Sequence, residues 1–98
     1  MSSSKEFRDF ILEQIFSIGD ISCKSMMGEF LLYYKGILFG GIYDDRLLIK
    51  RTNTNVDFNL LDAIPYQGAK PMYLVENLED REYLKSLILL TCCGLKNK

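Results

Sequence analysis

The stretch MMGEFLLYYKGILFGGIYDDRLLIK, residues 26–50, decides the fold of this 98-residue chain. Its aromatic and aliphatic runs are separated by Lys35-Gly36 and by Asp44-Asp45, which are residue types that tight hairpin turns prefer. The runs predict strands at residues 30–34, 37–43 and 47–51, preceded by a fourth strand at residues 21–25. We therefore expect an antiparallel meander in the first half of the chain.

An amphipathic helix is expected ahead of the meander. Ser3 and Glu6 have the spacing of a capping box, in which each side chain accepts a hydrogen bond from a backbone N–H of the first turn. Apolar residues recur behind them at intervals of three and four, which predicts a helix over residues 5–17. Gly19 is expected to end this helix, because glycine readily adopts the conformation that closes helices.

The second half of the chain predicts a short helix, a strand and a long helix. Residues 60–64 are mostly apolar and stop at Pro65, so we expect a loop and then a short helix that ends ahead of the proline. Residues 71–75 predict a strand at the edge of the sheet, because the proline that begins it has no N–H to donate. Asn77 is the expected N-cap of a final helix over residues 79–93.

The order of these elements predicts one α+β domain that spans residues 1–98, with residues 1–4 flexible. Helices at both ends of the chain would cover one face of an antiparallel sheet of four to five strands, giving two layers. A chain of this length rarely divides into two domains. Its 48% of hydrophobic residues are sufficient for a core without a metal or a disulfide.

Composition narrows the classes of function. A net charge of -1 and a pI of about 5.3 give no overall attraction for a nucleic acid. The N-terminus lacks the apolar segment of a secretory signal, and no apolar run approaches the roughly 18 residues of a membrane span. We therefore expect a cytoplasmic protein with no membrane partner. Cys23, Cys92 and Cys93 have no metal-ligand spacing and are expected to be reduced thiols.

No residue pattern indicates catalysis. Histidine is absent, which excludes the commonest general base and the commonest zinc ligand. Asp44 and Asp45 are adjacent, so their carboxylates do not converge, and we expect them to serve a turn. The glycines match no phosphate-binding motif, and Gly40-Gly41 instead indicates a β-bulge or a place where a helix backbone packs close to the sheet. We expect no enzyme, no cofactor and no metal.

Two alternatives stay open for the surface of the sheet. Its tyrosines could stack on bases, with phosphates bound by Lys24, Lys35, Lys50, Arg51 and Lys70. Tyrosine is also a good strand former, however, and we favour that structural role. Met26-Met27 either fills the core or provides a contact surface, since methionine side chains repack readily against a partner.

The residues around the first hairpin carry a resemblance to a known family. Lys24-Ser25-Met26-Met27-Gly28 resembles a motif of the N-terminal domain of the TfoX/Sxy competence regulators. The similarity continues over residues 15–91 through Tyr33, Gly36, Phe39, Leu47, Ile49 and Lys50. Three positions depart from the pattern: Met27 replaces a phenylalanine, and Glu29 and Leu31 replace glycines.

The resemblance implies a two-layer α+β fold and a non-enzymatic role in bacterial gene regulation, tied in that family to competence for DNA uptake. It also implies that the domain binds another protein, such as a transcription regulator, or a second copy of itself through a sheet edge or the Met-Tyr surface. The expected interaction residues are Lys24, Met26, Met27, Gly28, Glu29, Tyr33, Lys50 and Arg51. The alternatives are a nucleic-acid-contacting module and, less favoured, a small-ligand binder or enzyme.

Overall fold

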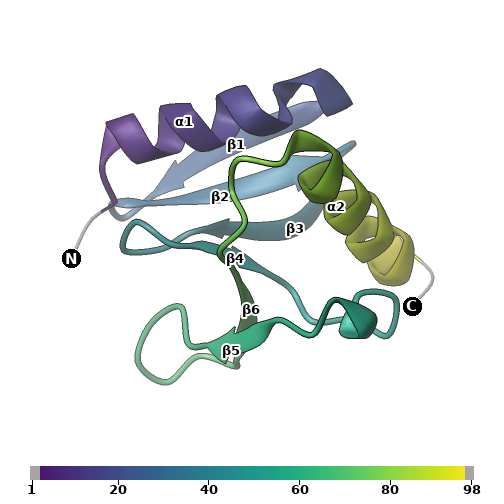
Figure 1. Cartoon of the computed structure of the whole chain (residues 1–98). Helices are drawn as coiled ribbons and strands as arrows, with labels where there is room; N and C mark the ends of the chain where they lie inside the picture. Colours follow the sequence, from purple (N-terminus) through teal and green to yellow (C-terminus); the bar gives the residue numbers. More distant parts are fainter. Residues whose placement is uncertain (1–2, 97–98) are drawn as a thin grey trace.

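The computed structural model describes residues 3–96, which fold into two layers. The helices α1 (Lys5–Ile15) and α2 (Arg81–Lys96) both lie on one face of a single antiparallel sheet (Figure 1). The predicted α+β class is confirmed. The sheet formed by the described residues has six strands rather than the expected four to five.

The strands follow the order β1-β2-β3-β4-β6-β5, and every neighbouring pair is antiparallel. Their bounds are β1 (Ile21–Met26), β2 (Glu29–Tyr34), β3 (Ile37–Ile42), β4 (Leu47–Ile49), β5 (Leu61–Ala63) and β6 (Met72–Val75). The first four form the predicted meander. Strand β6 then lies between β4 and β5, so the chain skips one position in the sheet and returns to fill it.

Tight two-residue turns connect the first four strands. Both residues of each turn have positive φ: 52° and 87° in Met27-Gly28, 49° and 80° in Lys35-Gly36, and 53° and 55° in Asp44-Asp45. Turns of this kind match the right-handed twist of the strands that they join, and glycine and aspartate tolerate them best. The predicted turns at Lys35-Gly36 and Asp44-Asp45 are therefore confirmed.

Residues that face the helices alternate along each strand with residues that face away from them. In β2, Phe30 and Leu32 are buried beneath the helices, and Glu29 and Leu31 belong to the opposite face. The core consists of Phe30, Leu32, Phe39, Ile42, Leu47, Ile49 and Val75 from the sheet, with Ile11, Ile15, Leu84, Leu87, Ile88 and Cys92 from the helices. The opposite face of the sheet is covered by no helix of the described residues.

The N-cap of helix α1 is Ser4, one residue later than the Ser3 that the capping box predicts. The Ser4 hydroxyl, not that of Ser3, accepts the bond from the Phe7 backbone N–H at 3.1 Å. Ser3 is instead drawn into the sheet, because its hydroxyl donates to the Glu29 carboxylate at 2.9 Å. The helix is followed by a 3-10 turn (Phe16–Ile18), and Gly19 with a φ of 89° ends it as expected.

Helix α2 differs from its prediction at both ends. It begins at Arg81, and the Asp80 side chain, rather than that of Asn77, accepts the Tyr83 backbone N–H at 3.1 Å. At the other end the helix continues past residue 93, its expected last residue, through Gly94 to Lys96. A side chain at position 94 would collide with Thr52 and Thr54, so this glycine serves the packing of a loop against the helix.

The segment before Pro65 contradicts the prediction of a short helix. Residues 61–63 form strand β5, because their backbone groups pair with β6. The predicted strand at residues 71–75 is confirmed as β6, but it lies inside the sheet and β5 forms the edge. The prediction of an edge position was wrong because Pro71 lies just before the strand and removes no bond from its ladder.

Gly40-Gly41 lies where the backbones of neighbouring strands approach closely, whereas one of the two predicted alternatives placed a helix backbone there. A Cβ atom at Gly40 would collide with the backbone carbonyl oxygen of Leu48, and one at Gly41 would lie 2.6 Å from that of Phe30. The register between β2 and β3 also shifts beside this point, so Phe39 is an extra residue in β3. The glycines therefore accompany a β-bulge.

Candidate functional site

A groove of about 1030 Å³ lies on the sheet surface that the helices leave uncovered. Its floor is formed by Leu31, Leu38 and Met72, which alternate with core residues along β2, β3 and β6. Leu48 belongs to the same surface but is fully buried, so the groove occupies only part of it. The lining is mostly apolar: Met26, Met27, Glu29, Leu31, Leu38, Gly40, Tyr43, Lys50, Arg51, Pro65, Tyr66, Ala69, Lys70, Pro71, Met72 and Leu95.

One wall of the groove is the loop of residues 64–71, which connects β5 to β6. This loop is held against the meander at two points. The Arg46 guanidinium donates to the Ile64 carbonyl at 3.2 Å, and the rings of Tyr43 and Tyr66 lie 6.3 Å apart between centroids. Pro65 is buried at the base of the wall. The wall is therefore fixed by contacts with the β3–β4 connection.

The opposite wall carries exposed methionines at the β1–β2 turn. Met27 occupies the turn itself and is 98% exposed, and Met26 precedes it and is 48% exposed. An apolar side chain that stays almost fully exposed buries no surface on folding, so it adds no hydrophobic stabilisation to the domain. Because methionine adapts its shape to a partner, these two side chains are suited to contact with a second molecule. They do not fill the core, which was one of the two open alternatives.

Basic side chains gather at one end of the groove. Ile49 pairs with Tyr73, so the next residues along the two antiparallel strands, Lys50 and Met72, lie at the same end. Lys70 lines the groove two residues before Met72. No carboxylate of the described residues forms an ion pair with Lys50 or Lys70. This end of the groove therefore carries two uncompensated cations.

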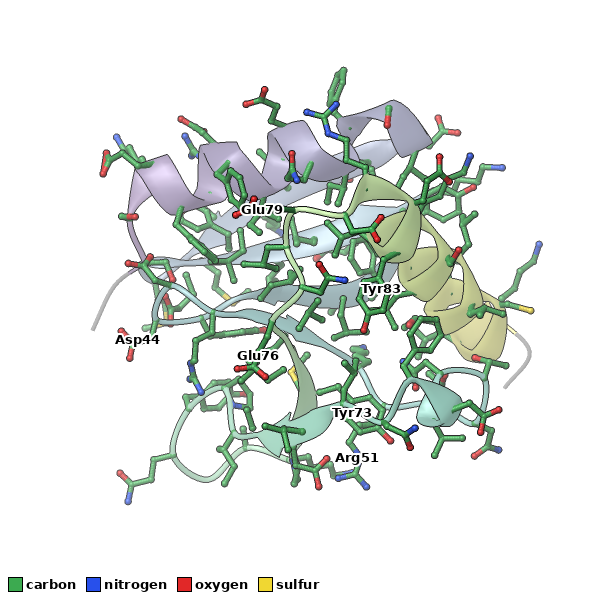
Figure 2. All side chains as sticks on the ribbon, viewed as in Figure 1. Asp44, Arg51, Tyr73, Glu76, Glu79 and Tyr83 are labelled. Carbon is green, nitrogen blue, oxygen red and sulfur yellow. The ribbon has the colours of Figure 1, made fainter. Side chains whose placement is uncertain are left out.

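Arg51 belongs to the same end but is engaged by the protein itself. Its guanidinium lies 3.4 Å from the Asp62 carboxylate and 5.8 Å from the centre of the Tyr73 ring. Figure 2 shows the Arg51 and Tyr73 side chains next to each other at the lower edge of the sheet. Because Arg51 is paired with Asp62, it adds less positive charge to this end of the groove than Lys50 and Lys70 do.

The other end of the groove contains Glu29, and both oxygens of its carboxylate accept hydrogen bonds from the chain itself. One oxygen accepts from the backbone N–H of Ser3 at 3.1 Å and from the Ser3 hydroxyl at 2.9 Å. The second oxygen accepts from the backbone N–H of Asp44 at 3.1 Å. Glu29 thus ties the start of the chain to the β3–β4 turn, and three hydrogen bonds to its carboxylate are made within the chain. Its role is structural.

The buried Asn55 positions the basic end. Its side-chain amide donates to the Lys50 carbonyl at 2.9 Å and to the Thr91 hydroxyl at 2.8 Å. Its oxygen accepts from the Thr52 backbone N–H at 3.0 Å. Because Thr91 belongs to α2, this residue fixes the end of β4 relative to the helix layer. No pattern in the sequence distinguishes Asn55 from the polar residues around it.

The structure brings together five of the eight expected interaction residues. Met26, Met27, Glu29, Lys50 and Arg51 line the groove. Lys24 lies in β1 opposite Leu31, on the face of the sheet that carries the groove, but it is not part of the lining. Gly28 forms the β1–β2 turn, and its carbonyl accepts from Ser3. Tyr33 also lies outside the lining.

Sequence reasoning missed the wall formed by residues 64–71. The signal that was available is the pair of dipeptides Pro65-Tyr66 and Pro71-Met72, in which a large side chain follows a proline at each end of the loop. Their position beneath the meander depends on β6 lying beside β4, which no local pattern encodes.

The thiols and carboxylates of the chain are poorly suited to chemistry. Burial raises the pKa of the Cys92 thiol to about 11 and also raises the pKa of the Cys23 thiol, so both are protonated at neutral pH. Asp45 lies in the predicted turn, but its carboxylate accepts the backbone N–H of the distant Ser4 at 2.7 Å rather than a local N–H. Figure 2 shows Asp44 at the outer end of its hairpin. Among residues 3–96, no three histidine, cysteine, aspartate or glutamate side chains are grouped closely enough to hold a metal ion.

Comparisons with known proteins leave the family open. No protein-family model matches the sequence. A search of curated proteins finds no match. The resemblance to the TfoX/Sxy regulators therefore stays a prediction. Within the described part of the chain, neither helix has the length and apolarity that crossing a membrane requires.

Proposed function

We propose that this chain is a non-enzymatic protein-interaction domain that binds its partner in the groove. The observation that carries the proposal is the groove itself, a large apolar hollow with exposed methionines on one wall and a fixed loop as the other. Exposed apolar surface of this kind marks sites of interaction in soluble domains. The predicted kinship with the TfoX/Sxy regulators points in the same direction, to a cytoplasmic regulatory role with a protein such as a transcription regulator as partner.

The groove fits a protein segment better than a small substrate. Sites for small molecules combine enclosure with several convergent polar groups that orient the ligand. Here the only carboxylate in the lining, that of Glu29, is used within the chain, and Arg51 is paired with Asp62. The protonated thiols of Cys23 and Cys92 are also poor nucleophiles. These properties support a binding function rather than a catalytic one.

The test compares two matched substitutions on opposite layers of the domain. Met27→Glu changes a residue of the groove that is 98% exposed, and Phe16→Glu changes a residue behind α1 that is 73% exposed. Neither substitution removes core packing, so both variants should keep their thermal stability. The tagged chain is used to capture partners from its native cytoplasm, and each captured protein is measured with both variants.

We expect Met27→Glu to abolish capture and Phe16→Glu to preserve it. Light scattering of the purified chain separates a foreign partner from a second copy. A monomer that captures no protein, or a partner that binds both variants equally, contradicts the proposal.

A nucleic-acid contact is the second candidate, and it rests on the gathering of Lys50, Arg51 and Lys70 at one end of the groove. Such binding would weaken steeply with salt, because each neutralised phosphate releases counterions. Titration of the chain with duplex and single-stranded DNA at low salt tests it. Absence of binding under these conditions rules the candidate out.

A further inference from the structure

The groove has an uneven distribution of charge, and this property indicates what it binds. Its floor and walls are apolar, while Lys50 and Lys70 at one end have no acidic partner among the described residues. At the other end, the Glu29 carboxylate already accepts three hydrogen bonds. A bound molecule therefore meets apolar surface along the groove and two free cations at one end.

We propose that the groove binds a short amphipathic segment of a partner protein, whose apolar side chains contact the floor and whose acidic side chains pair with Lys50 and Lys70. This inference rests on the proposed function and specifies the chemistry of the partner. A carboxylate beside the two ammonium groups gives the complementary charge that the domain itself does not supply. Met26 and Met27 adapt to the apolar side chains of the segment.

A second copy of this chain is a poor occupant of the same groove. In a symmetric dimer the same patch meets itself, and the one carboxylate that each groove could offer to Lys50 and Lys70 of its partner, that of Glu29, already accepts three hydrogen bonds within its own chain. Nucleic acid is also disfavoured, because a long polyanion meets two free cations here in a chain whose overall net charge is -1.

Selection from a random peptide library tests the inference directly. Twelve-residue peptides are displayed and selected on the immobilised full chain, and the enriched peptides are synthesised for titration. We expect them to combine apolar residues with an excess of aspartate and glutamate. Each peptide is titrated against the native chain and against two charge-reversed variants of equal net charge.

The variant Lys50→Glu/Lys70→Glu changes the groove, and Lys5→Glu/Lys85→Glu changes exposed positions of α1 and α2. We expect affinity to fall on the order of tenfold in the first and to stay within about twofold in the second, since each pair at the rim contributes modestly. Lys50→Gln/Lys70→Gln removes the charges without adding new ones, and a smaller loss is expected there. If the charge-reversed chain is unstable, the affinity of the peptides for Lys50→Gln/Lys70→Gln tests the role of the two lysines instead.

The possible outcomes separate this inference from the proposed function. Peptides that bind the native chain and fail on Met27→Glu, yet show no acidic excess and bind the lysine variants unchanged, overturn the inference and leave the proposed function intact. No enrichment, or enriched peptides that bind Met27→Glu unchanged, overturns both. Palmitate or a DNA duplex that binds the groove more tightly than the selected peptides, and that none of them displaces, also overturns the inference.

Discussion

Replacement of the buried Asn55 by alanine tests how the basic end of the groove is held. The Asn55 side chain is fully buried and makes three hydrogen bonds, to the Lys50 carbonyl, the Thr91 hydroxyl and the Thr52 backbone N–H. Alanine removes all three. The Thr91 hydroxyl still donates to the Leu87 carbonyl at 2.7 Å, whereas the groups of Lys50 and Thr52 lose a partner that water cannot readily replace.

The expected loss of stability follows from these three bonds. Each intramolecular hydrogen bond contributes about 1 kcal/mol net, and a buried polar group without a partner costs about 1–3 kcal/mol. Asn55→Ala should therefore lower the free energy of unfolding by about 3 kcal/mol. That is a large part of the roughly 5–15 kcal/mol that stabilises a domain.

Urea unfolding measures this loss. With a slope of about 1 kcal/mol per molar urea, the midpoint should move down by roughly 3 M without a change of slope. Asn53→Ala is the matched control, because Asn53 is exposed in the same loop. It should change stability by less than about 0.5 kcal/mol.

A double-mutant cycle with Thr91→Val assigns the effect to the contact with α2. The coupling energy between positions 55 and 91 should be about 1 kcal/mol, since the two side chains are in direct contact at 2.8 Å. A loss below about 1 kcal/mol for Asn55→Ala, or a coupling energy near zero, would refute this account of the loop.

Three further predictions concern the sheet, the thiols and the start of the chain. Gly40→Ala should destabilise the domain by about 3 kcal/mol in thermal unfolding, because its methyl group would collide with the Leu48 carbonyl and strand backbone cannot move aside cheaply; an unchanged melting temperature contradicts the close approach. Burial raises the pKa of the Cys92 thiol from 9.0 to about 11, so the unfolded chain loses this proton first as pH rises. The contribution of Cys92 to the free energy of unfolding is therefore complete below pH 9 and is lost as the pH rises through 11, about 3 kcal/mol in all, and Cys92→Ala should remove that part of the pH dependence. Glu29→Gln should lower the free energy of unfolding by about 1–2 kcal/mol, because the NH₂ group of glutamine would face N–H or O–H donors. Hydrogen exchange at the Asp44 backbone N–H should then be faster in the variant. Equal protection in both proteins rules out the role of Glu29 in tying Ser3 to the β3–β4 turn.

The local patterns of the sequence predicted the elements whose causes are themselves local. The meander follows from turn residues such as Lys35-Gly36, and α1 follows from apolar spacing that its burial confirms. Residues 61–63 were misassigned because their strand depends on pairing with β6, which lies elsewhere in the sequence. The end of α2 was placed too early, at residue 93, because Gly94 lies inside the helix, where the loop residues Thr52 and Thr54 pack against it. Tertiary packing overrides the local preference in both cases.

The groove could be predicted only in part, for the same reason. Met26, Met27 and Lys50 were recognised as surface candidates because they lie in the stretch that forms the meander. The wall of residues 64–71 and the anchoring role of Asn55 required the position of β6 and of α2. Glu29 departs from the family pattern, and its function became clear only from the hydrogen bonds that it accepts.

The position of β6 between β4 and β5 also sets the order in which the sheet can be completed during synthesis. Strands β1 to β4 pair across two-residue turns and can form as soon as they leave the ribosome. Pairing of Ile49 with Tyr73 must instead close a loop of roughly 23 residues, at an entropic cost of about 3 kcal/mol. Until then the open edge of β4 can pair with another nascent chain. The groove, which needs Lys50 beside Met72, consequently forms only after the meander, when β6 has been added to the sheet.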